Sequence, residues 1–236
     1  MWFGEHAHRA RTRAAARLVL ERAPTFVALQ EVTRASLSWL LEDLGDAYLS
    51  SDTDGSTFDE YGTLLLARVR PESLWLAELP TSMGRSMPYG VFSIAGARLA
   101  VGAVHLESHR HNGETREDQL RECFARLASF EHAVLMGDFN FADREPEEQS
   151  IPSAFRDAWK QTHGPSEPGF TRDTATNAMA RAARDNAVRR RIDRVLLRSP
   201  TLTATASKLE GAAPIDASGA LYVSDHFGVS VEIAPR

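Results

Sequence analysis

The sequence predicts an α/β protein in which two packed β-sheets are flanked by helices. Short apolar strands follow one another in groups, and amphipathic helices separate the groups. Neighbouring strands are joined by connections short enough for hairpins, which disfavours the alternative of one doubly wound parallel sheet. The 236 residues, 43% of them hydrophobic, can bury a substantial core. Because no linker, repeat or low-complexity tract interrupts the chain, we expect a single domain over residues 1–236.

The N-terminal part is predicted to alternate helix, strand and helix. Helical periodicity covers residues 6–22, a short buried strand covers 25–32, and a second helix covers 33–44. Thr33 stands where the N-cap of the second helix is expected. The leucines of this helix recur at i, i+3, i+4 and i+7 and therefore share one face: Leu37, Leu40, Leu41 and Leu44.

Strands dominate the middle of the chain. Four are predicted in succession, at 61–69, 73–79, 89–96 and 98–108, with a tight hairpin at Ala95-Gly96-Ala97 between the last two. An amphipathic helix follows at 114–130. It carries the only cysteine, Cys123, on its apolar stripe, so we expect a packed thiol and no internal disulfide.

The remaining elements alternate again. A buried strand is predicted at 133–139, a helix around 152–162, and further strands at 191–198, 202–209 and 226–233. The chain contains no apolar run that could span a bilayer and no signal-peptide pattern. We therefore expect a cytoplasmic protein, and we expect it to be a monomer.

The charge distribution is uneven. The net charge of −5 gives no overall attraction to nucleic acid, yet residues 171–198 carry eight arginines. One interpretation is a phosphate-facing patch. The other is a composition bias, because the only lysines among the 27 basic residues are Lys160 and Lys208.

Polar side chains border five of the predicted strands. A single carboxylate at a strand end is usually a turn or cap residue, but this set combines carboxylates, an amide and imidazoles. When several strands end at the same edge of two packed sheets, such side chains can meet in one site at that edge. The residues are Glu31, His105, Glu107, Asp138, Asn140, Asp193, Asp225 and His226.

These residue types suit cleavage of a phosphodiester with a hard divalent cation. Mg²⁺ takes few carboxylates and keeps several waters, so Glu31 and one aspartate would be enough. A further carboxylate can orient and deprotonate the attacking water, while Asn and His donate hydrogen bonds to phosphate oxygens. The sequence offers no Ser nucleophile elbow, Walker loop or CxxC zinc pattern as a competing chemistry.

The segments “LQEV”, “HLES”, “GDFN”, “RIDRV” and “SDHFGV”, in this order, resemble the endonuclease/exonuclease/phosphatase superfamily of Mg²⁺-dependent phosphodiesterases. The resemblance covers nearly the whole chain and points to the branch of 5′-tyrosyl-DNA phosphodiesterases of the second type, through “HLESHR”, “GDFNFADREPE”, “FRDAW” and “GFTRDTATN”. It implies a four-layer α/β/β/α sandwich of two mixed sheets and a role in DNA repair.

The resemblance also implies a role for each matching residue. Glu31 would be the principal metal ligand, with Asp138 and Asp225 supporting the ion or its water. Asp138 would position the nucleophilic water, and Asn140 would bind the scissile phosphate. His226 would contact the phosphate and be oriented by Asp193, and His105 would lie on the phosphate side. Tyr61, Arg85 and Phe170 align with substrate-side segments, and core packing is the alternative for the two aromatic residues. Arg110, close behind His105, is either a phosphate contact or a surface charge.

The chain departs from the branch at three places. The branch has Arg two residues after the Asn of its “GDxN” segment, where this chain has Ala142, and Arg144 stands two residues further on. It has Trp after the Thr of “YTWD”, where this chain has Arg172. It also begins with a strand ending in Asn, whereas Met1 directly precedes Trp2 here, so we expect that first strand to be missing through an upstream start or a truncation.

The sequence therefore predicts a phosphodiesterase that uses Mg²⁺, with Mn²⁺ as the other candidate ion, and that acts on nucleic-acid ends. Two alternatives stay open. One is a phosphatase or phosphodiesterase for a small-molecule or lipid substrate, because the superfamily's fold supports those activities too. The other is a weakly active, degenerate homologue.

Overall fold

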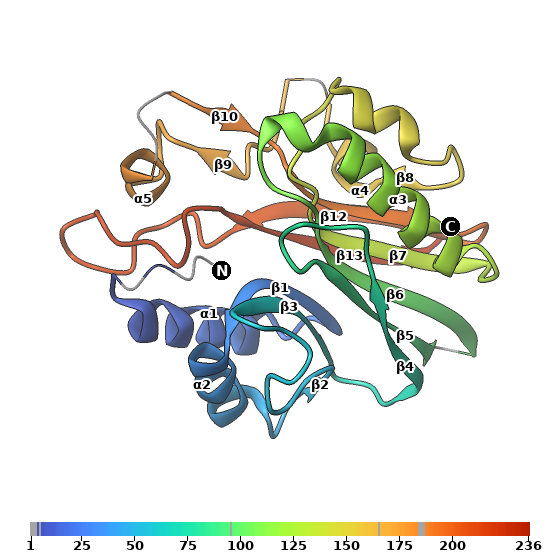
Figure 1. Cartoon of the computed structure of the whole chain (residues 1–236), viewed down its shortest axis with the longest axis horizontal. Coiled ribbons are helices and arrows are strands. Elements are labelled where there is room, and N and C mark those ends of the chain that lie inside the picture. Colours follow the sequence, from blue (N-terminus) through green and yellow to red (C-terminus); the bar gives the residue numbers. More distant parts are fainter. Residues whose placement is uncertain (1–3, 5, 95, 165, 184–186) are drawn as a thin grey trace.

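The computed structural model describes residues 4, 6–94, 96–164, 166–183 and 187–236 (Figure 1). The expectation of a missing first strand concerns residues 1–3, which lie outside the described residues, as do Ala95 of the predicted hairpin and Arg184 of the arginine-rich segment.

The N-terminal part forms a small antiparallel sheet with two helices on one side. Its strands are β1 (Phe26–Thr33), β3 (Tyr61–Ala67) and β2 (Leu49–Ser50), hydrogen-bonded in that order, and its helices are α1 (His8–Arg22) and α2 (Arg34–Leu44). The predicted cap is confirmed: the Thr33 side chain accepts from the N–H of Ser36, and the Ser36 hydroxyl accepts from the N–H of Thr33.

A six-stranded sheet carries the rest of the core. Its order is β4 (Pro71–Glu78), β5 (Ser86–Ile94), β6 (Ala97–His105), β7 (His132–Asp138), β11 (Asp193–Arg198) and β8 (Arg156–Asp157). Only the β6–β7 pair is parallel, and the crossover between these two strands contains helix α3 (Gly113–Leu127). The doubly wound parallel alternative is therefore wrong.

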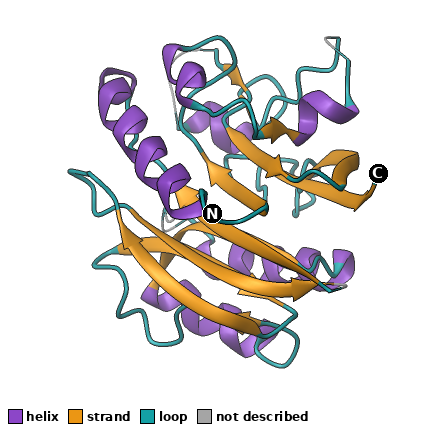
Figure 2. Cartoon of the chain, turned by 90° about the vertical axis from the view of Figure 1, so that its right-hand side faces the viewer, coloured by secondary structure: helices purple, strands orange, loops and turns teal. Residues whose placement is uncertain are grey.

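The buried side chains show how the layers stack. On β3, Leu64 and Leu66 pack with helix α2, while Leu65 and Ala67 pack against the six-stranded sheet, because successive strand residues face opposite sides. On the far side of that sheet, Leu120 and its neighbours on α3 pack against β6 and β7. The predicted α/β class is confirmed; these buried clusters run in the order helix, sheet, sheet, helix, and both views show helices outside the strands (Figures 1 and 2). Cys123 is fully buried in this α3 interface, and burial raises the pKa of its thiol, so the packed-thiol prediction is confirmed.

Two ribbons and several short helices complete the described chain. The ribbons are β12 (Leu202–Glu210) with β13 (Gly228–Pro235), and β9 (Arg172–Asp173) with β10 (Arg189–Arg190). The short helices are η1 (Arg110–Asn112), η2 (Pro146–Ser150), α4 (Ala158–Thr162) and α5 (Ala178–Ala182).

The helix predicted around 152–162 is shorter than expected. Its N-cap is Asp157, whose carboxylate accepts from the N–H groups of Trp159 and Lys160, so α4 begins only at Ala158. Asp157 itself lies in strand β8 at the edge of the large sheet. Within the described ranges, none of the helices combines the length and apolar character needed to cross a membrane.

Candidate active site

Three neighbouring strands of the large sheet bring their polar ends into one row. The register places His105, at the end of β6, beside Asp138, at the end of β7. It also pairs Asp138 with Asp193, the first residue of β11. Nε2 of His105 lies 3.5 Å from Oδ2 of Asp138. Three of the predicted site residues therefore meet because strand pairing alone puts them side by side.

The turn after β7 fixes Asp138 and Asn140. Gly137 has φ 138°, and a Cβ at this position would lie 2.0 Å from the carbonyl oxygen of Val104, so only glycine fits. Asn140, with φ 56°, donates its backbone N–H to Oδ1 of Asp138 at 2.8 Å. Its side-chain amide donates to the carbonyl of Leu106 at 2.9 Å. Both side chains are thus held by local hydrogen bonds at the edge of the sheet.

His226 joins the row from the loop before β13. Its Nδ1 lies 3.0 Å from Oδ2 of Asp193 and 4.0 Å from Oδ2 of Asp138. Thr171 ties this loop to β11, because its hydroxyl accepts from the N–H of Asp193 at 3.2 Å and its carbonyl accepts from the N–H of Phe227 at 2.7 Å. The sequence analysis missed Thr171; its place in “GFTRD” next to a cluster of site segments was the only available signal.

Burial and charge shift the pKa values of this group strongly. Burial raises the pKa of Asp138 to about 7; the Asp193 carboxylate adds to the rise, and His226 opposes it. Burial lowers the pKa of His226, but the carboxylate of Asp193, which is also its hydrogen-bond partner, outweighs burial and raises the value to about 9. His226 is therefore held as a cation beside two carboxylates.

His105 is in the opposite state. It is 3% exposed, and burial, followed by the charge of Arg85, lowers the pKa of its imidazole well below the usual value. Nη1 of Arg85 lies 3.0 Å from Nδ1 of His105. Because a guanidinium can only donate, Nδ1 is the acceptor and the proton sits on Nε2, which faces Asp138.

Two of the predicted substrate-side residues lie behind His105. The guanidinium of Arg85 is 5.3 Å from the ring centroid of Tyr61 and donates to the Ser108 hydroxyl at 3.0 Å. The Tyr61 ring is 6.4 Å from the His105 ring. Arg85 is only 6% exposed, so it affects the site mainly by its contact with the His105 imidazole.

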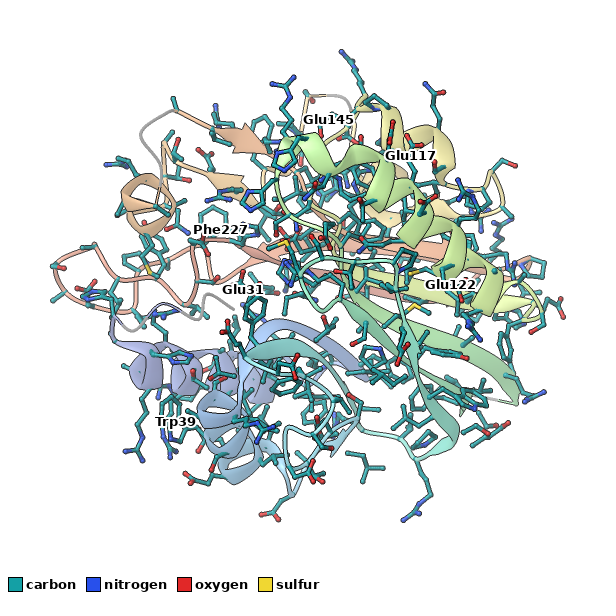
Figure 3. All side chains as sticks on the ribbon, viewed as in Figure 1. Glu31, Trp39, Glu117, Glu122, Glu145 and Phe227 are labelled. Atoms are coloured by element: carbon teal, nitrogen blue, oxygen red, sulfur yellow. The ribbon has the colours of Figure 1, made fainter. Side chains whose placement is uncertain are left out.

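Glu31 enters the site from the small sheet through a break in strand pairing. The register of β1 with β3 shifts between Leu29 and Val32, and Glu31 within this bulge has φ 58°. A bulge re-aims side chains, and a positive φ in a non-glycine residue is a strained conformation that surrounding structure must enforce. The charge of Glu31 contributes to the raised pKa of Asp138, so its carboxylate faces the same site. Figure 3 shows Glu31 in the middle of the molecule, on the side of β1 toward Phe227.

Asp225 is also buried near the row, with 8% exposure. Its Oδ2 lies 3.6 Å from Nη2 of Arg172, the residue that replaces the branch's Trp. Its charge contributes to the raised pKa of His226. Of the residues predicted to be catalytic, the structure brings together five through contacts of 4.0 Å or less, and Glu31 and Asp225 lie near enough to act on them by charge; the five are His105, Asp138, Asn140, Asp193 and His226.

A group of possible metal ligands lies within this site. Among the described residues, one ligand atom each of Asp138, Asp193 and His226 lies within 4.8 Å of the others. This set shares Asp138 with the predicted ligands but leaves out Glu31 and Asp225. Burial, and then the negative charges of Asp193 and Glu31, raise the pKa of Asp138, and a bound divalent cation would stabilise its charged form.

One of the polar strand-end residues, Glu107, was expected in this site but lies outside it. Glu107 follows β6 and is 1% exposed, and its carboxylate accepts from the hydroxyl of Thr81 and from the N–H and hydroxyl of Ser82. Burial raises the pKa of Glu107, but these hydrogen bonds outweigh burial and lower it. Glu107 is therefore an anchor for the loop before β5.

A cavity of about 610 Å³ opens beside Asn140. The predicted substrate residue Arg110 lies exposed on its wall, together with Arg172 and Arg190 from the β9–β10 ribbon. Phe170, also predicted on the substrate side, is half-buried, and the guanidinium of Arg189 covers one ring face at 4.8 Å from the centroid.

The arginine-rich segment divides between support and surface. Arg191 is buried and donates to Asp143 and Asp157, and Arg194 lies within 3.5 Å of these two carboxylates and of Glu148. These two arginines are structural, since buried charges are retained where they are paired. Arg172 and Arg190 instead face the cavity, so neither interpretation of the segment holds for all of it.

Sequence comparison gives two matches over most of the chain. The description of the matching family reads “Endonuclease/Exonuclease/phosphatase family”, and the match covers residues 2–226. Tyrosyl-DNA phosphodiesterase 2 from Danio rerio is 27% identical over 218 residues, or 87% of this chain. The aligned region is 57% of that relative, so the chain spans little more than half of its length.

Solved structures are similar over nearly the whole chain. A humanized D. rerio TDP2 is 26% identical with a TM-score of 0.83, covering 98% of this chain and 94% of that one. D. rerio TDP2 complexed with a single-strand DNA product is 25% identical with a TM-score of 0.84, covering 97% and 93%. Sphingomyelinase C from Streptomyces griseocarneus, 19% identical with a TM-score of 0.74 and coverage of 97% and 92%, is similar in fold alone.

Proposed function

The chain belongs to the endonuclease/exonuclease/phosphatase family, and from this membership we propose that it is a Mg²⁺-dependent phosphodiesterase acting on the ends of nucleic-acid strands. The observation that carries the proposal is the row of His105, Asp138 and Asp193, completed by His226. The similarity to tyrosyl-DNA phosphodiesterase 2, which in one structure holds a single-strand DNA product, supports nucleic acid as the substrate.

The donor set fits a hard divalent ion. Oxygen ligands are those that Mg²⁺ prefers, and the carboxylates of Glu31, Asp138 and Asp225 are the groups that would hold it. His226 is left out of this set, because its Nδ1 is engaged by Asp193. When bound, the ion polarises the phosphoryl oxygen and offsets the charge that develops in the transition state. The same oxygen donors would accept Mn²⁺.

The residues of the chain supply the remaining steps. Asp138 orients a water and accepts its proton as the water oxygen attacks phosphorus and the bond to the leaving oxygen breaks. The amide of Asn140 and the cationic ring of His226 donate to the non-bridging oxygens of the phosphate. Asp193 fixes the orientation of His226 at 3.0 Å. The products are a phosphomonoester and a free hydroxyl group.

The test compares a 5′-tyrosyl oligonucleotide with a plain phosphodiester in the presence of Mg²⁺. We expect tyrosine release by the wild-type chain, loss of release with a chelator, and a fall of at least about 100-fold in Asp138→Asn. Arg98→Gln is the matched surface control, because Arg98 is exposed and pairs only with Glu72 among the described residues. Turnover that survives chelation or the Asp138→Asn change contradicts the proposed chemistry.

A second candidate is a phosphodiesterase for a small-molecule or lipid substrate. Ala142 and Arg172 stand where the tyrosyl-DNA branch has Arg and Trp, and the net charge is −5. Salt separates the candidates, because a substrate held through several phosphates loses affinity steeply as salt rises. Salt-insensitive hydrolysis of the plain diester, without competition by DNA, would favour this candidate. The meeting of His105, Asp138, Asp193 and His226 at one place counts against a degenerate site.

A further inference from the structure

The cavity beside the candidate active site is lined by three arginines and one carboxylate, Glu145. Asn140, two residues after Asp138, forms part of its wall, so the cavity lies next to the row of His105, Asp138 and Asp193. Arg172 and Arg190 come from the paired strands of the β9–β10 ribbon, where they are register partners. Arg110 contributes a third guanidinium, and the stacked rings of His109 and His111 flank it.

Two of the three guanidinium groups, those of Arg172 and Arg190, are held by ion pairs and keep unused donors. Nη2 of Arg190 donates to Glu145, and that carboxylate also accepts from the N–H of Ala142 at 2.8 Å. Arg172 is paired with Asp225, while its Nε is buried without a hydrogen-bond partner among the described residues. Arg110 has no ion-pair partner in the part of the chain that the structure describes. Figure 3 shows Glu145 beside the β10 ribbon and the start of α3.

The three guanidinium groups on the wall outnumber its one carboxylate, so the cavity favours the binding of an anion. A guanidinium has five N–H donors, and each of these ion pairs uses only part of that capacity. Among the described residues the wall contains no Phe, Tyr or Trp, and its aromatic rings are the two imidazoles of His109 and His111, so guanidinium groups are the main binding groups that it offers. Phosphate is the anion that matches several forked donors in a wet, half-open space.

We propose that this cavity is an anion subsite that holds a second phosphate group of the substrate, next to the phosphate that is cleaved. The proposal rests on the proposed function, since the position of the phosphate that is cleaved is inferred from the proposed hydrogen bond with Asn140. It assigns substrate selectivity to Arg172 and Arg190. A substrate with two phosphates should therefore be preferred over one with a single phosphate and an uncharged group in this position.

The kinetic test uses two chromogenic esters. One is thymidine 5′-(p-nitrophenyl phosphate) with a free 3′-hydroxyl, and the other carries an added 3′-phosphate. We expect the 3′-phosphate to raise kcat/KM about tenfold or more in the wild type, the effect of one charge-assisted contact. In Arg190→Gln and in Arg172→Gln, the ratio between the two esters should fall toward one. Arg98→Gln, a matched change on an exposed strand residue, should keep the wild-type ratio.

A binding measurement separates failure of this proposal from failure of the proposed function. Thymidine 3′,5′-bisphosphate and thymidine 5′-monophosphate are titrated calorimetrically into the wild type and the same variants. A tenfold tighter binding of the bisphosphate that is lost in Arg190→Gln supports the subsite even when neither ester is hydrolysed. An equal affinity for both nucleotides in the wild type overturns it, as does a preference that survives in both cavity variants.

A third ester identifies where the second phosphate comes from. It links the 3′-phosphate to another nucleoside, so that the added charge is part of a strand. An equal gain for this ester and for the terminal 3′-phosphate supports the subsite with a polynucleotide as its source. A gain confined to the terminal phosphate supports the subsite with a small phosphorylated ligand, and a gain for neither ester overturns the proposal.

Discussion

Substitution of Asp52 by Asn tests whether the loop between β2 and β3 is held by one buried carboxylate. Asp52 is 6% exposed, and its two oxygens accept from the N–H groups of Asp54, Gly55 and Thr57 and from the Thr57 hydroxyl. The loop also delivers Phe58 to the core of the small sheet. An Asn side chain has the same shape as Asp, but its NH₂ group would face N–H and O–H donors that now bind a carboxylate oxygen. Those donors would then lose their hydrogen-bond acceptor.

The pKa of Asp52 gives the magnitude. Burial by itself raises this pKa, but the hydrogen bonds from Thr57, Asp54 and Gly55 outweigh it and lower the value from 3.8 to about 2. A difference of about two pKa units corresponds to about 2–3 kcal/mol. Because the folded-state pKa is depressed, this stability is fully present above pH 3.8 and is lost as the pH falls toward 2.

Urea unfolding followed by tryptophan fluorescence measures the effect at pH 7, 5 and 3. Asp52→Asn should lower the free energy of unfolding by about 2 kcal/mol at pH 7 and pH 5, and by less at pH 3. The matched control is Asp54→Asn, because the exposed Asp54 accepts one hydrogen bond, from Ser56; we expect a change of about 0.5 kcal/mol or less. A loss at Asp52 equal to that at Asp54, or independent of pH, refutes the reasoning.

Three further substitutions probe the fold and the site. Arg194→Met should lower the free energy of unfolding by about 2 kcal/mol, since it removes a buried cation from the carboxylates of Asp143, Asp157 and Glu148 and leaves only Arg191 and Lys160 to balance them, whereas Arg121→Met on the surface should change it little; urea unfolding compares them. Gly137→Ala should lower the free energy of unfolding by about 3 kcal/mol or more, because Gly137 has φ 138° and the added Cβ would lie 2.0 Å from the carbonyl oxygen of Val104. The control Gly84→Ala should lower it by about 1 kcal/mol, because a Cβ there meets nothing within 4 Å. Equal losses of stability for the two variants in thermal unfolding would contradict the steric argument. Asp193→Asn should lower kcat at least about 100-fold with little change in KM for a diester substrate, and an unchanged kcat in steady-state assays would remove Asp193 from the proposed mechanism.

The local part of the fold was predictable because its causes are local. Thr33 caps α2 through a side chain three residues from its partner, and the leucine spacing defines the buried face of that helix. The alternating burial of β3 likewise follows from strand geometry. His105, Asp138 and Asp193 meet because the pairing of β6, β7 and β11 puts these strand ends side by side, so polar residues at the ends of predicted strands already indicated this part of the site.

What could not be predicted depends on partners far away in sequence. Glu107 looked like a member of the site, and its true partners, Thr81 and Ser82, are 25 or more residues away. The roles of Arg191 and Arg190 diverge although they are neighbours, because one faces the carboxylate of Asp157 and the other faces the cavity. The ribbon strands β9 and β10 have two residues each, too few for any periodicity to reveal them.

The location of the cavity arginines on the β9–β10 ribbon has a consequence for how this protein can change over evolutionary time. The catalytic row is built on three long strands of the main sheet, where any backbone change would disturb all three. The ribbon has only two paired positions and forms a sheet of its own, so Arg190, which is paired with Glu145, can be exchanged with little disturbance to the row, whereas Arg172 is also paired with Asp225. On the proposed subsite, substrate choice is therefore separable from bond-breaking chemistry at Arg190, where a new preference can arise while the row is inherited intact.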